Sequence, residues 1–442
     1  MYKLLTAILT DRLYRLAERY GLLDPAQEGF RKLHSTLRQA QSLHWSIKEV
    51  SEREGQVYVV YLDFSNAFNS VDVAALWAWL RHLNIPDIDI LQSLYEGAHY
   101  VADLPSGRSA TVTLTRGTKQ GDKLSPLLFS LVFNALLLAL KKTGVGYRTI
   151  QGLRSSSRGF ADDLVLVTGS SRGMGTLLQV VSNFCAWAGM RVNLAKSVIT
   201  AFDHREKRDL PTEAVLFDGQ PLVHLSADAS FKYLGIRASL VRKGKRKDKL
   251  PVPCCTEEKK HIFASTRELV TLSRNHKFLF RQMVPAMHMV ATSRFRYSAP
   301  LVAWTDADLD KLHTVWLQVH KASWRVPPSF ASAPLTLPSE NGGCPVEHPR
   351  VHLIQALAGH IEQLVALPDE LRETTRRQYQ RLCESCGCHT AQELAEFLLR
   401  EQSPRPCPIA RLLRACAQLD TQIRLPACLS LGKVERETSW NA

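Results

Sequence analysis

The segment SSSRGFADDLVLVTGS, residues 155–170, carries the pattern that decides the fold. It predicts a β-hairpin with Asp162 and Asp163 at its turn, between Gly159-Phe160 and a strand from Leu164 to Thr168. An aromatic-x-Asp-Asp string arises by chance in roughly one chain in ten of this length. An Asp pair is also common at the tip of a hairpin. Its meaning therefore depends on the rest of the chain.

A third carboxylate, Asp63, lies near the end of QVYVVYLDF, residues 56–64, a run typical of a buried central strand. Asp63 can approach Asp162 and Asp163 only if the two strands are neighbours in one sheet. Clustered carboxylates repel one another, and a divalent cation with a preference for oxygen ligands, such as Mg²⁺, removes that conflict. Two such ions about 3.5–4 Å apart form the clamp used for in-line phosphoryl transfer.

The sequence on either side predicts an α+β module over residues 1–240, followed by an all-helical region. Apolar periodicity predicts helices at about 3–20, 33–50, 72–83, 87–97, 125–142 and 172–188. Short strands are expected near residues 99–104, 110–115, 190–200, 214–217, 221–225 and 231–238. Further helices are expected at 256–274, at 276–297 with a kink at Pro285, and at 306–324 with Thr305 as cap.

Composition indicates an ordinary globular protein. The chain has 442 residues, of which 45% are hydrophobic and 22% charged, which excludes disordered, collagen-like and fibrous classes. A formal charge of +14 favours a polyanionic partner such as nucleic acid, with a basic enzyme that binds none as the alternative. The apolar run from Leu127 to Leu140 is shorter than the roughly 20 residues that cross a bilayer. It predicts a buried helix and no membrane partner.

Ten cysteines are too sparse for a disulfide scaffold, and no secretory signal precedes them. We therefore expect reduced thiols in an intracellular compartment, either nucleus or cytoplasm. The cluster Cys383-x-x-Cys386-x-Cys388-His389 raises the question of zinc, but its spacing is poor for a tetrahedral site. Thr390 suits the cap of a following helix, so helix-end cysteines are the preferred interpretation and zinc is not expected.

Five segments occur in a fixed order, namely YLDFSNAFNSVD (61–72), RGTKQGDKLSPLLFSLVFNAL (116–136), GFADDLVLV (159–167), WAGMRVNLAKS (187–197) and FKYLGI (231–236). This series resembles the palm motifs of reverse transcriptases, most closely those of non-LTR retrotransposons. The segment LLTAILTDRLYRLAERYGLLDPAQEGFRKLHST, residues 4–36, is similar to part of the fingers of that family. The resemblance extends from about Tyr2 to Gly235, and more weakly to Gly342-Gly343.

The resemblance implies an α+β right-hand polymerase fold, in which fingers and a palm with an antiparallel sheet precede an all-helical thumb and C-terminal extension. The implied division is partial fingers at 1–56 and a palm at 57–240, with an inserted fingers segment at about 72–118. A thumb-like region at 241–335 and the extension at 336–442 follow. The implied activity is that of an RNA-directed DNA polymerase, a nucleotidyltransferase with RNA template, DNA primer and dNTPs as partners.

The resemblance also implies roles for individual residues. Asp63 and Asp162 are similar to the two metal-binding aspartates, and Asp163 to a third, supporting carboxylate. The backbone carbonyl of Phe64 is expected to complete one metal shell, with two Mg²⁺ ions that Mn²⁺ can replace. Phe68 matches the aromatic wall that excludes a ribose 2′-hydroxyl, the alternative being a simple core residue.

The loop RGTKQGDKLSP, residues 116–126, is expected to meet the nucleotide and template. Gly117 and Gly121 permit a close backbone approach, and Gln120 with Gly121 is placed against the nascent base pair. Ser125 and Pro126 are expected to begin the next helix as cap and first-turn residue. Asn66 and Asn69 depart from the family, whose members often have Lys and Asp there. Neither position is a metal ligand, so the departure puts the tuning of the activity in doubt and not the activity itself.

Three cations have two interpretations each. Arg31 and Lys32 would face the triphosphate, or form a surface basic pair. Lys196 resembles a lysine near the leaving pyrophosphate, or only packs and hydrogen-bonds its loop.

The run RKGKRKDK, residues 242–249, holds six basic residues, Arg242, Lys243, Lys245, Arg246, Lys247 and Lys249. Contact with the template–primer backbone is the preferred interpretation. A solvated loop and a nuclear localisation signal are the alternatives.

The resulting prediction is a retroelement RNA-directed DNA polymerase, with its oligomeric state undecided. Met1 lies inside the fingers block, and no endonuclease or RNase H signature is recognisable. A truncated, catalytically inactive nucleic-acid-binding remnant is therefore the main alternative. An RNA-synthesising polymerase is a second, which Phe68 disfavours.

Overall fold

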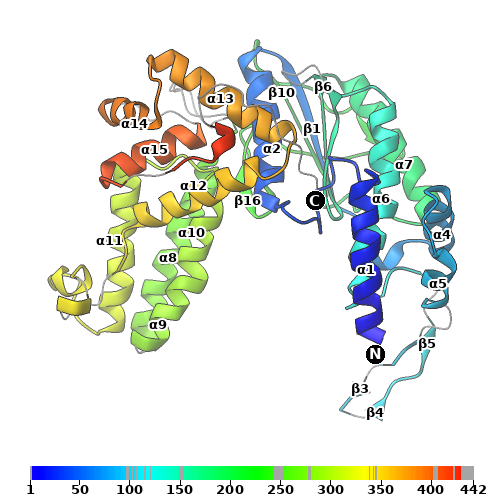
Figure 1. The fold of residues 1–442 in the computed structure, drawn as a ribbon, viewed down its shortest axis with the longest axis horizontal. Helices are drawn as coiled ribbons and strands as arrows, with labels where there is room; N and C mark the ends of the chain where they lie inside the picture. Colours follow the sequence, from blue (N-terminus) through cyan, green and yellow to red (C-terminus); the bar gives the residue numbers. More distant parts are fainter. Residues whose placement is uncertain are drawn as a thin grey trace. The chain divides into compact units, whose positions relative to one another are not determined.

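The computed structural model describes residues 2–95, 99–101, 103–105, 107–113, 116–119, 121–148, 154–241, 253–276, 280–337, 339–341, 343, 346–401, 407–421 and 424–429. The chain divides into two compact units. The first comprises Met1–Ala229 with Ser239–Lys245, and the second comprises Ser230–Ala238 with Arg246–Ala442. The first unit is mixed α/β and the second is mainly helical (Figure 1), as the sequence predicts.

A six-stranded sheet forms the centre of the first unit, in the order β11-β10-β1-β9-β8, with β14 beside β10. Its strands are β1 (Gln56–Leu62), β8 (Ser157–Phe160), β9 (Asp163–Thr168), β10 (Val198–Asp203), β11 (Arg208–Asp209) and β14 (Val223–His224). All pairs are antiparallel except β10 with β14. Six of the seven residues of β1 are buried, which explains why its sequence is a continuous apolar run.

The register of the sheet brings the carboxylates of distant segments to one edge. Strand β1 pairs with β9 from Tyr58↔Thr168 to Leu62↔Leu164. Strand β9 pairs with β8 up to Phe160↔Asp163, which leaves Ala161 and Asp162 as a two-residue turn. Asp63 follows the last residue of β1, so it lies beside this turn.

The helices of the first unit are α1 (Tyr2–Arg19), α2 (Thr36–Glu52), α3 (Ala67–Ser70), α4 (Val73–His82), α5 (Ile88–Ser93), α6 (Leu124–Lys142) and α7 (Ser171–Ala188). Small hairpins pair β2 (His99–Tyr100) with β5 (Val112–Thr113), β3 (Asp103–Leu104) with β4 (Gly107–Arg108), β6 (Tyr147–Arg148) with β7 (Arg154–Ser155), and β12 (Leu216–Phe217) with β13 (Gln220–Pro221).

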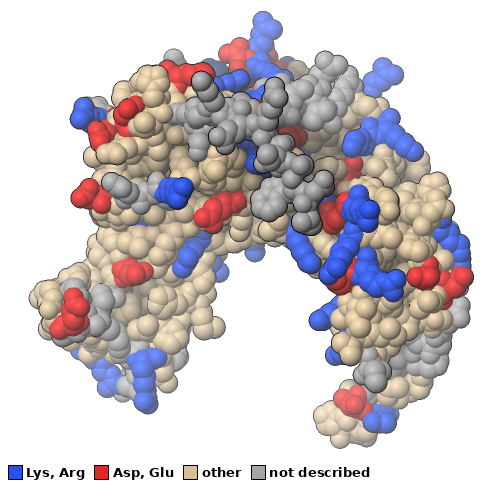
Figure 2. All heavy atoms as spheres, viewed as in Figure 1, with Lys and Arg blue, Asp and Glu red and all other residues tan. Residues whose placement is uncertain are grey.

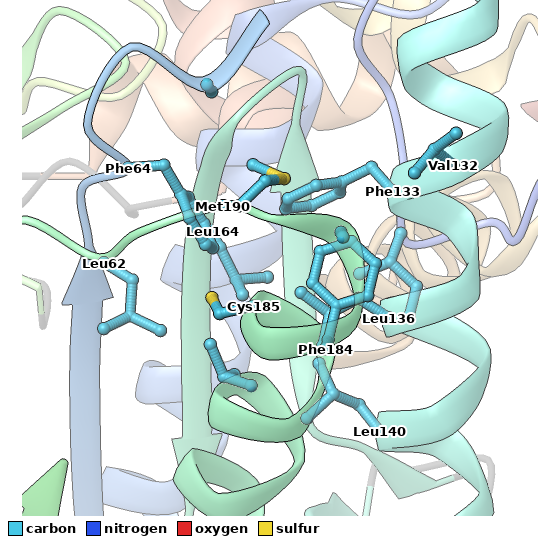
Figure 3. Packing of buried hydrophobic residues seen from close by; sticks show 14 of the residues in the cluster. Leu62, Phe64, Val132, Phe133, Leu136, Leu140, Leu164, Phe184, Cys185 and Met190 are labelled. Carbon is cyan, nitrogen blue, oxygen red and sulfur yellow. The ribbon is translucent and has the colours of Figure 1, made fainter. Parts of the chain in front are cut away.

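Helix α6 is the centre of the hydrophobic core. It is long and apolar enough to cross a membrane by length and composition alone, yet 72% of its most apolar window is buried inside the protein. Phe133 and Leu136 of α6 pack with Phe184 of α7, and Phe64 packs on the same cluster (Figure 3). This packing supports the core helix that the sequence predicts.

The start of α6 corrects one prediction. Helix α6 begins at Leu124 after Lys123, so Ser125 is its second residue and not its N-cap. The Ser125 hydroxyl instead donates to the Lys119 carbonyl at 2.6 Å, while the Leu124 amide donates to Asp122 Oδ1 at 3.4 Å. The serine therefore ties the preceding loop to the helix.

The second unit begins with the hairpin of β15 (Phe231–Tyr233) and β16 (Ile236–Ala238). Its helices are α8 (Thr256–His276), α9 (Phe280–Ala286), α10 (Ser293–Ser298), α11 (Asp306–Ser323), α12 (Pro349–Val365), α13 (Glu370–Cys386), α14 (Ala391–Arg400) and α15 (Pro408–Gln418). Pro285 lies in α9, directly before a π-helical turn from Met287 to Thr292, which is the irregularity expected near a helix proline. Thr305 caps α11 in a capping box, as predicted.

Polar contacts fasten this unit internally. The Tyr297 hydroxyl of α10 donates to the Leu234 carbonyl in the β15–β16 turn at 2.5 Å. Arg411 of α15 donates to the carbonyls of Ala299, Pro300 and Val302, which follow α10. These bonds satisfy carbonyls at a helix end that would otherwise lack partners.

Candidate active site

Three carboxylates lie at adjacent ends of the two central strands. Asp63 follows β1, Asp162 occupies the hairpin turn, and Asp163 opens β9. Desolvation, and then the charges of Asp162 and Asp63, raise the pKa of Asp163 to about 6. Desolvation and the charge of Asp63 also raise the pKa of Asp162, against a backbone hydrogen bond that lowers it. The three carboxylates therefore lie close enough to repel one another, as carboxylates that bind one cation together do.

The backbone around Asp63 is fixed by the segment after α7. The Asp63 carbonyl accepts from the Asn193 amide at 2.7 Å, and the Asp63 amide donates to Ser197 Oγ at 3.1 Å. The Ser65 amide donates to the Arg191 carbonyl at 2.8 Å. These bonds do not use the Phe64 carbonyl. The Phe64 ring is buried and meets the Phe133 ring edge-on, with 5.6 Å between the ring centroids (Figure 3).

A cavity of about 380 Å³ adjoins Asp162. Its lining comes from Asp162, from residues 64 and 66–69, and from residues 118, 119, 121, 122, 125 and 126. Its volume is within the range of small-molecule sites, roughly 300–1,000 Å³. Of the residues that the sequence assigns to nucleotide binding, Phe68 and Gly121 therefore border the same space as Asp162.

Phe68 lies in the wall of this cavity. Its ring stacks on Phe129 with 4.1 Å between centroids and meets Phe30 edge-on at 5.9 Å. Phe68 is half-buried, so one part of its ring packs in the core while another part borders the cavity. Both interpretations of this residue, as core residue and as wall, thus describe part of its environment.

The two loop glycines differ in their surroundings. Gly117 has a φ of +81°, and a Cβ there would lie 2.6 Å from the Asn69 Cα, so only glycine fits. Gly121 has a φ of +79° but no atom within 4 Å of the same position. The close approach expected of Gly117 is made to the protein itself, whereas Gly121 borders open space in the cavity.

Lys119 is a cavity residue that sequence reasoning missed. Its ammonium donates to the Leu94 carbonyl and to the Tyr2 hydroxyl, and lies 5.1 Å from the centre of the Tyr95 ring. Desolvation lowers the pKa of Lys119, an effect that the charge of Asp122 opposes. Its position between Gly117 and Gln120 in the loop was the available signal.

Arg31 and Lys32 have very different environments. The Arg31 guanidinium makes two bonds to Glu18, at 2.8 and 2.9 Å, and donates to the carbonyls of Asp24 and Gln27. Only 10% of the Arg31 side chain is exposed, against 73% for Lys32. A contact from Arg31 to a triphosphate would require some of these bonds to break, so that role stays a prediction.

The remaining predicted residues are partly outside the described structure. Lys196 is exposed and lies in a tight turn, in which its own backbone amide donates to the Asn193 carbonyl at 3.1 Å. Gln120 lies outside the described residues, as do Arg242, Lys243, Lys245, Arg246, Lys247 and Lys249. Cys383 and Cys386 lie in the last turn of α13, and Thr390 caps α14 as expected.

The donor set suits a hard divalent cation, since it consists of carboxylate oxygens and a backbone carbonyl. Within the described residues, no group of three or more His, Cys, Asp or Glu side chains is close enough to hold a metal ion. Asp63, Asp162 and Asp163 also form no ion pair with the basic residues that the structure describes. A bound cation would therefore offset the repulsion among these three carboxylates.

These features define a class of protein: a mixed α/β fold with uncompensated carboxylates at the ends of two central strands, beside a ligand-sized cavity. The model of the reverse transcriptase (RNA-dependent DNA polymerase) family matches residues 1–238, more than half of the chain. The chain belongs to that family, which confirms the resemblance identified in its sequence.

Curated relatives come from retrotransposons. The chain is 34% identical over 202 residues to the Retrovirus-related Pol polyprotein from type-1 retrotransposable element R2 of Popillia japonica, a match covering 45% of this chain and 28% of the relative. It is 29% identical over 237 residues to the Pol polyprotein of element R2DM of Drosophila melanogaster, covering 52% and 22%. The matches thus span about a quarter of the relatives' length. Apo telomerase from Candida Tropicalis aligns with a TM-score of 0.40 and 11% identity, over 84% of this chain and 60% of that one.

Proposed function

We propose that this chain is an RNA-directed DNA polymerase of a retroelement, which transfers a nucleotidyl group from a dNTP to a primer 3′-hydroxyl. One observation carries the proposal. In a chain of the reverse transcriptase family, Asp63, Asp162 and Asp163 lie at adjacent strand ends, Asp162 lines the cavity, and the pKa values of Asp162 and Asp163 are raised.

The finer architecture is part of this proposal. Residues 1–56 would form part of the fingers, and 57–240 the palm, with a fingers insertion at about 72–118. Residues 241–335 would form the thumb and 336–442 a helical extension. The largely antiparallel sheet in the first unit and the helices of the second support this assignment of a right-hand polymerase.

The mechanism assigns each group a task. Asp63, Asp162 and the Phe64 carbonyl would hold Mg²⁺ or Mn²⁺, with Asp163 in support. The bound ions would lower the pKa of the primer hydroxyl and offset the charge of the triphosphate. Phe68 would exclude a ribose 2′-hydroxyl by its bulk, and Gly121 would let the incoming base pair approach the loop backbone.

Basic side chains support a nucleic-acid partner. The chain carries a formal charge of +14, and α1 exposes Arg12, Arg15 and Arg19. Figure 2 shows Lys and Arg side chains gathered over the part of the first unit where Figure 1 draws α1. We assign this surface to contacts with the phosphates of the template or primer, together with the basic run at 242–249.

Primer extension tests the proposal. The purified chain is given an RNA template, a DNA primer, dNTPs and Mg²⁺ or Mn²⁺, beside the Asp162→Asn variant. Extension by the wild type that is lost in the variant supports the polymerase. A folded wild type that binds template–primer but adds no nucleotide would overturn it in favour of the non-catalytic nucleic-acid-binding protein.

A further inference from the structure

The turn that carries Asp162 has an unfavourable backbone conformation. Ala161 has a φ of +57°, in the left-handed region that residues with a side chain rarely adopt. Ala161 is the first of the two turn residues, and its carbonyl belongs to the peptide group that also contains the Asp162 amide. The orientation of that peptide group therefore sets the position of the Asp162 backbone and the direction in which its side chain leaves it.

Gln27 holds this peptide from the side. Its Oε1 accepts from the Ala161 amide at 2.9 Å and from the Gly29 amide at 2.9 Å. Its Nε2 donates to the Ala161 carbonyl at 3.1 Å. The Gln27 residue is fully buried, so water does not compete for these bonds. One side chain thus binds both backbone polar groups of the strained residue, 134 positions away in the sequence.

The segment around Gln27 is pressed against the hairpin. Gln27 forms an isolated parallel bridge with Gly159, whose amide donates to the Ala26 carbonyl at 2.8 Å. A Cβ on Gly29 would lie 2.2 Å from the Ala161 nitrogen, so that position is glycine because the turn is so close. Segment and turn thus fit each other as one unit.

Gln39 of α2 provides an internal comparison. It is also buried, and its Nε2 donates to the Ala26 and Gly159 carbonyls at 2.9 and 2.8 Å. It therefore joins the same segment to β8, but the described contacts do not include the turn. Removing Gln39 should loosen the packing without reorienting Asp162.

We propose that Gln27 is a positioning residue, which fixes the Ala161–Asp162 peptide so that the Asp162 carboxylate can hold a divalent cation. This inference rests on the metal-binding role proposed above for Asp162. Two directed hydrogen bonds on the left-handed residue Ala161 act on the aspartate through the backbone, as groups behind a metal's direct ligands do elsewhere.

The test measures binding of Mn²⁺ alone to the full chain, from the electron paramagnetic resonance signal of the free ion. Gln27→Met removes all three bonds at similar volume, and Gln39→Met is the matched control. We expect Gln27→Met to weaken Mn²⁺ binding by roughly tenfold or more, within the range for such outer groups. Gln39→Met should lower the melting temperature comparably and change Mn²⁺ affinity less than about twofold. In extension assays Gln27→Met should lower kcat with little change in the KM for dNTP.

A second variant pair separates positioning from simple packing. Ala161→Gly removes the backbone strain, because glycine adopts positive φ readily, so Gln27→Met/Ala161→Gly should regain part of the lost affinity. If Gln27→Met does not fold, this double variant is compared with Gln39→Met/Ala161→Gly and should bind Mn²⁺ more weakly.

Equal losses in the Gln27 and Gln39 variants, or no loss in either, would overturn the inference. Mn²⁺ binding that is equally weak in the wild type and in Asp162→Asn would overturn the metal site itself, and the inference with it. Mn²⁺ binding that depends on Asp162 and Gln27 in a chain without extension activity would retain the inference and refute only the polymerase.

Discussion

The carboxylates at the sheet of the first unit differ in their partners from two carboxylates of the helical unit, the buried Glu258 and the half-buried Asp308. Glu258 of α8 accepts from both the backbone amide and the guanidinium of Arg237, each at 3.1 Å. Asp308 accepts from Lys259 at 2.6 Å. Asp63, Asp162 and Asp163 instead repel one another. The paired charges join α8 to β16 and to α11, whereas unpaired ones cost stability and indicate a functional site.

The largest effect should come from breaking a pair in the helical unit. Glu258 is 1% exposed, and Glu258→Gln would leave the Arg237 guanidinium without its carboxylate. We expect the free energy of unfolding to fall by about 3 kcal/mol, measured by urea denaturation. The neighbouring Glu257→Gln, which breaks only the exposed pair with Lys260, should cost less than about 0.5 kcal/mol. Equal losses in the two variants would contradict the account of this pair.

The loop glycines provide a matched pair within the first unit. Gly117→Ala would place a Cβ 2.6 Å from the Asn69 Cα in addition to its left-handed strain. We expect a loss of about 2–3 kcal/mol for Gly117→Ala and about 1 kcal/mol for Gly121→Ala, which meets no neighbour. Thermal unfolding of both variants measures the difference, and the reverse order would show that the loop is not packed as described.

Phe68→Val should change selectivity more than stability. A smaller side chain in the cavity wall would admit a 2′-hydroxyl, so the preference for dNTP over NTP should fall by roughly tenfold to a hundredfold. The readout is the ratio of kcat/KM for dCTP and CTP at a single templated position. An unchanged ratio with intact dNTP activity would leave Phe68 as a core residue only.

A smaller effect is expected from pH in the helical unit. Burial, and then the charge of His288, lower the pKa of His320 to about 4, below its ordinary value of 6.5. Folding therefore favours the neutral imidazole of His320. Its contribution to the free energy of unfolding is complete above pH 6.5 and is lost as the pH falls towards 4. We expect a decrease of about 1–2 kcal/mol between pH 7 and pH 5. His320→Gln should reduce this slope in urea denaturation; an identical slope would exclude His320 as its cause.

The sequence predicted the features that local patterns encode. The apolar run of β9, the buried strand before Asp63 and the Thr305 cap all lie where their local residues indicate. Of the Asp pair, Asp162 lies in the turn as predicted, whereas Asp163 is the first residue of β9. The domain limits and the roles of the site residues stay predictions.

Contacts between distant segments were not predictable in this way. The bonds of Gln27 to Ala161 join positions 134 residues apart, and no local period marks them. Nothing in the segment around Arg31 marks a buried ion pair, yet its guanidinium donates to the carboxylate of Glu18 in α1. Ser125 looks like a helix cap, but α6 begins at Leu124, and the Ser125 hydroxyl donates to the carbonyl of Lys119 in the preceding loop. In each case a tertiary partner overrides the local preference.

The most direct test of the account measures stability and single-nucleotide addition in the same Asp162→Asn preparation. Because Asp162 is repelled by its neighbour, the variant should unfold at an equal or higher urea concentration than the wild type. Its rate of adding one dNMP to a primer on an RNA template should fall by roughly a thousandfold or more. A variant that is destabilised yet extends the primer at the wild-type rate would contradict the claim that these carboxylates are kept unpaired for catalysis.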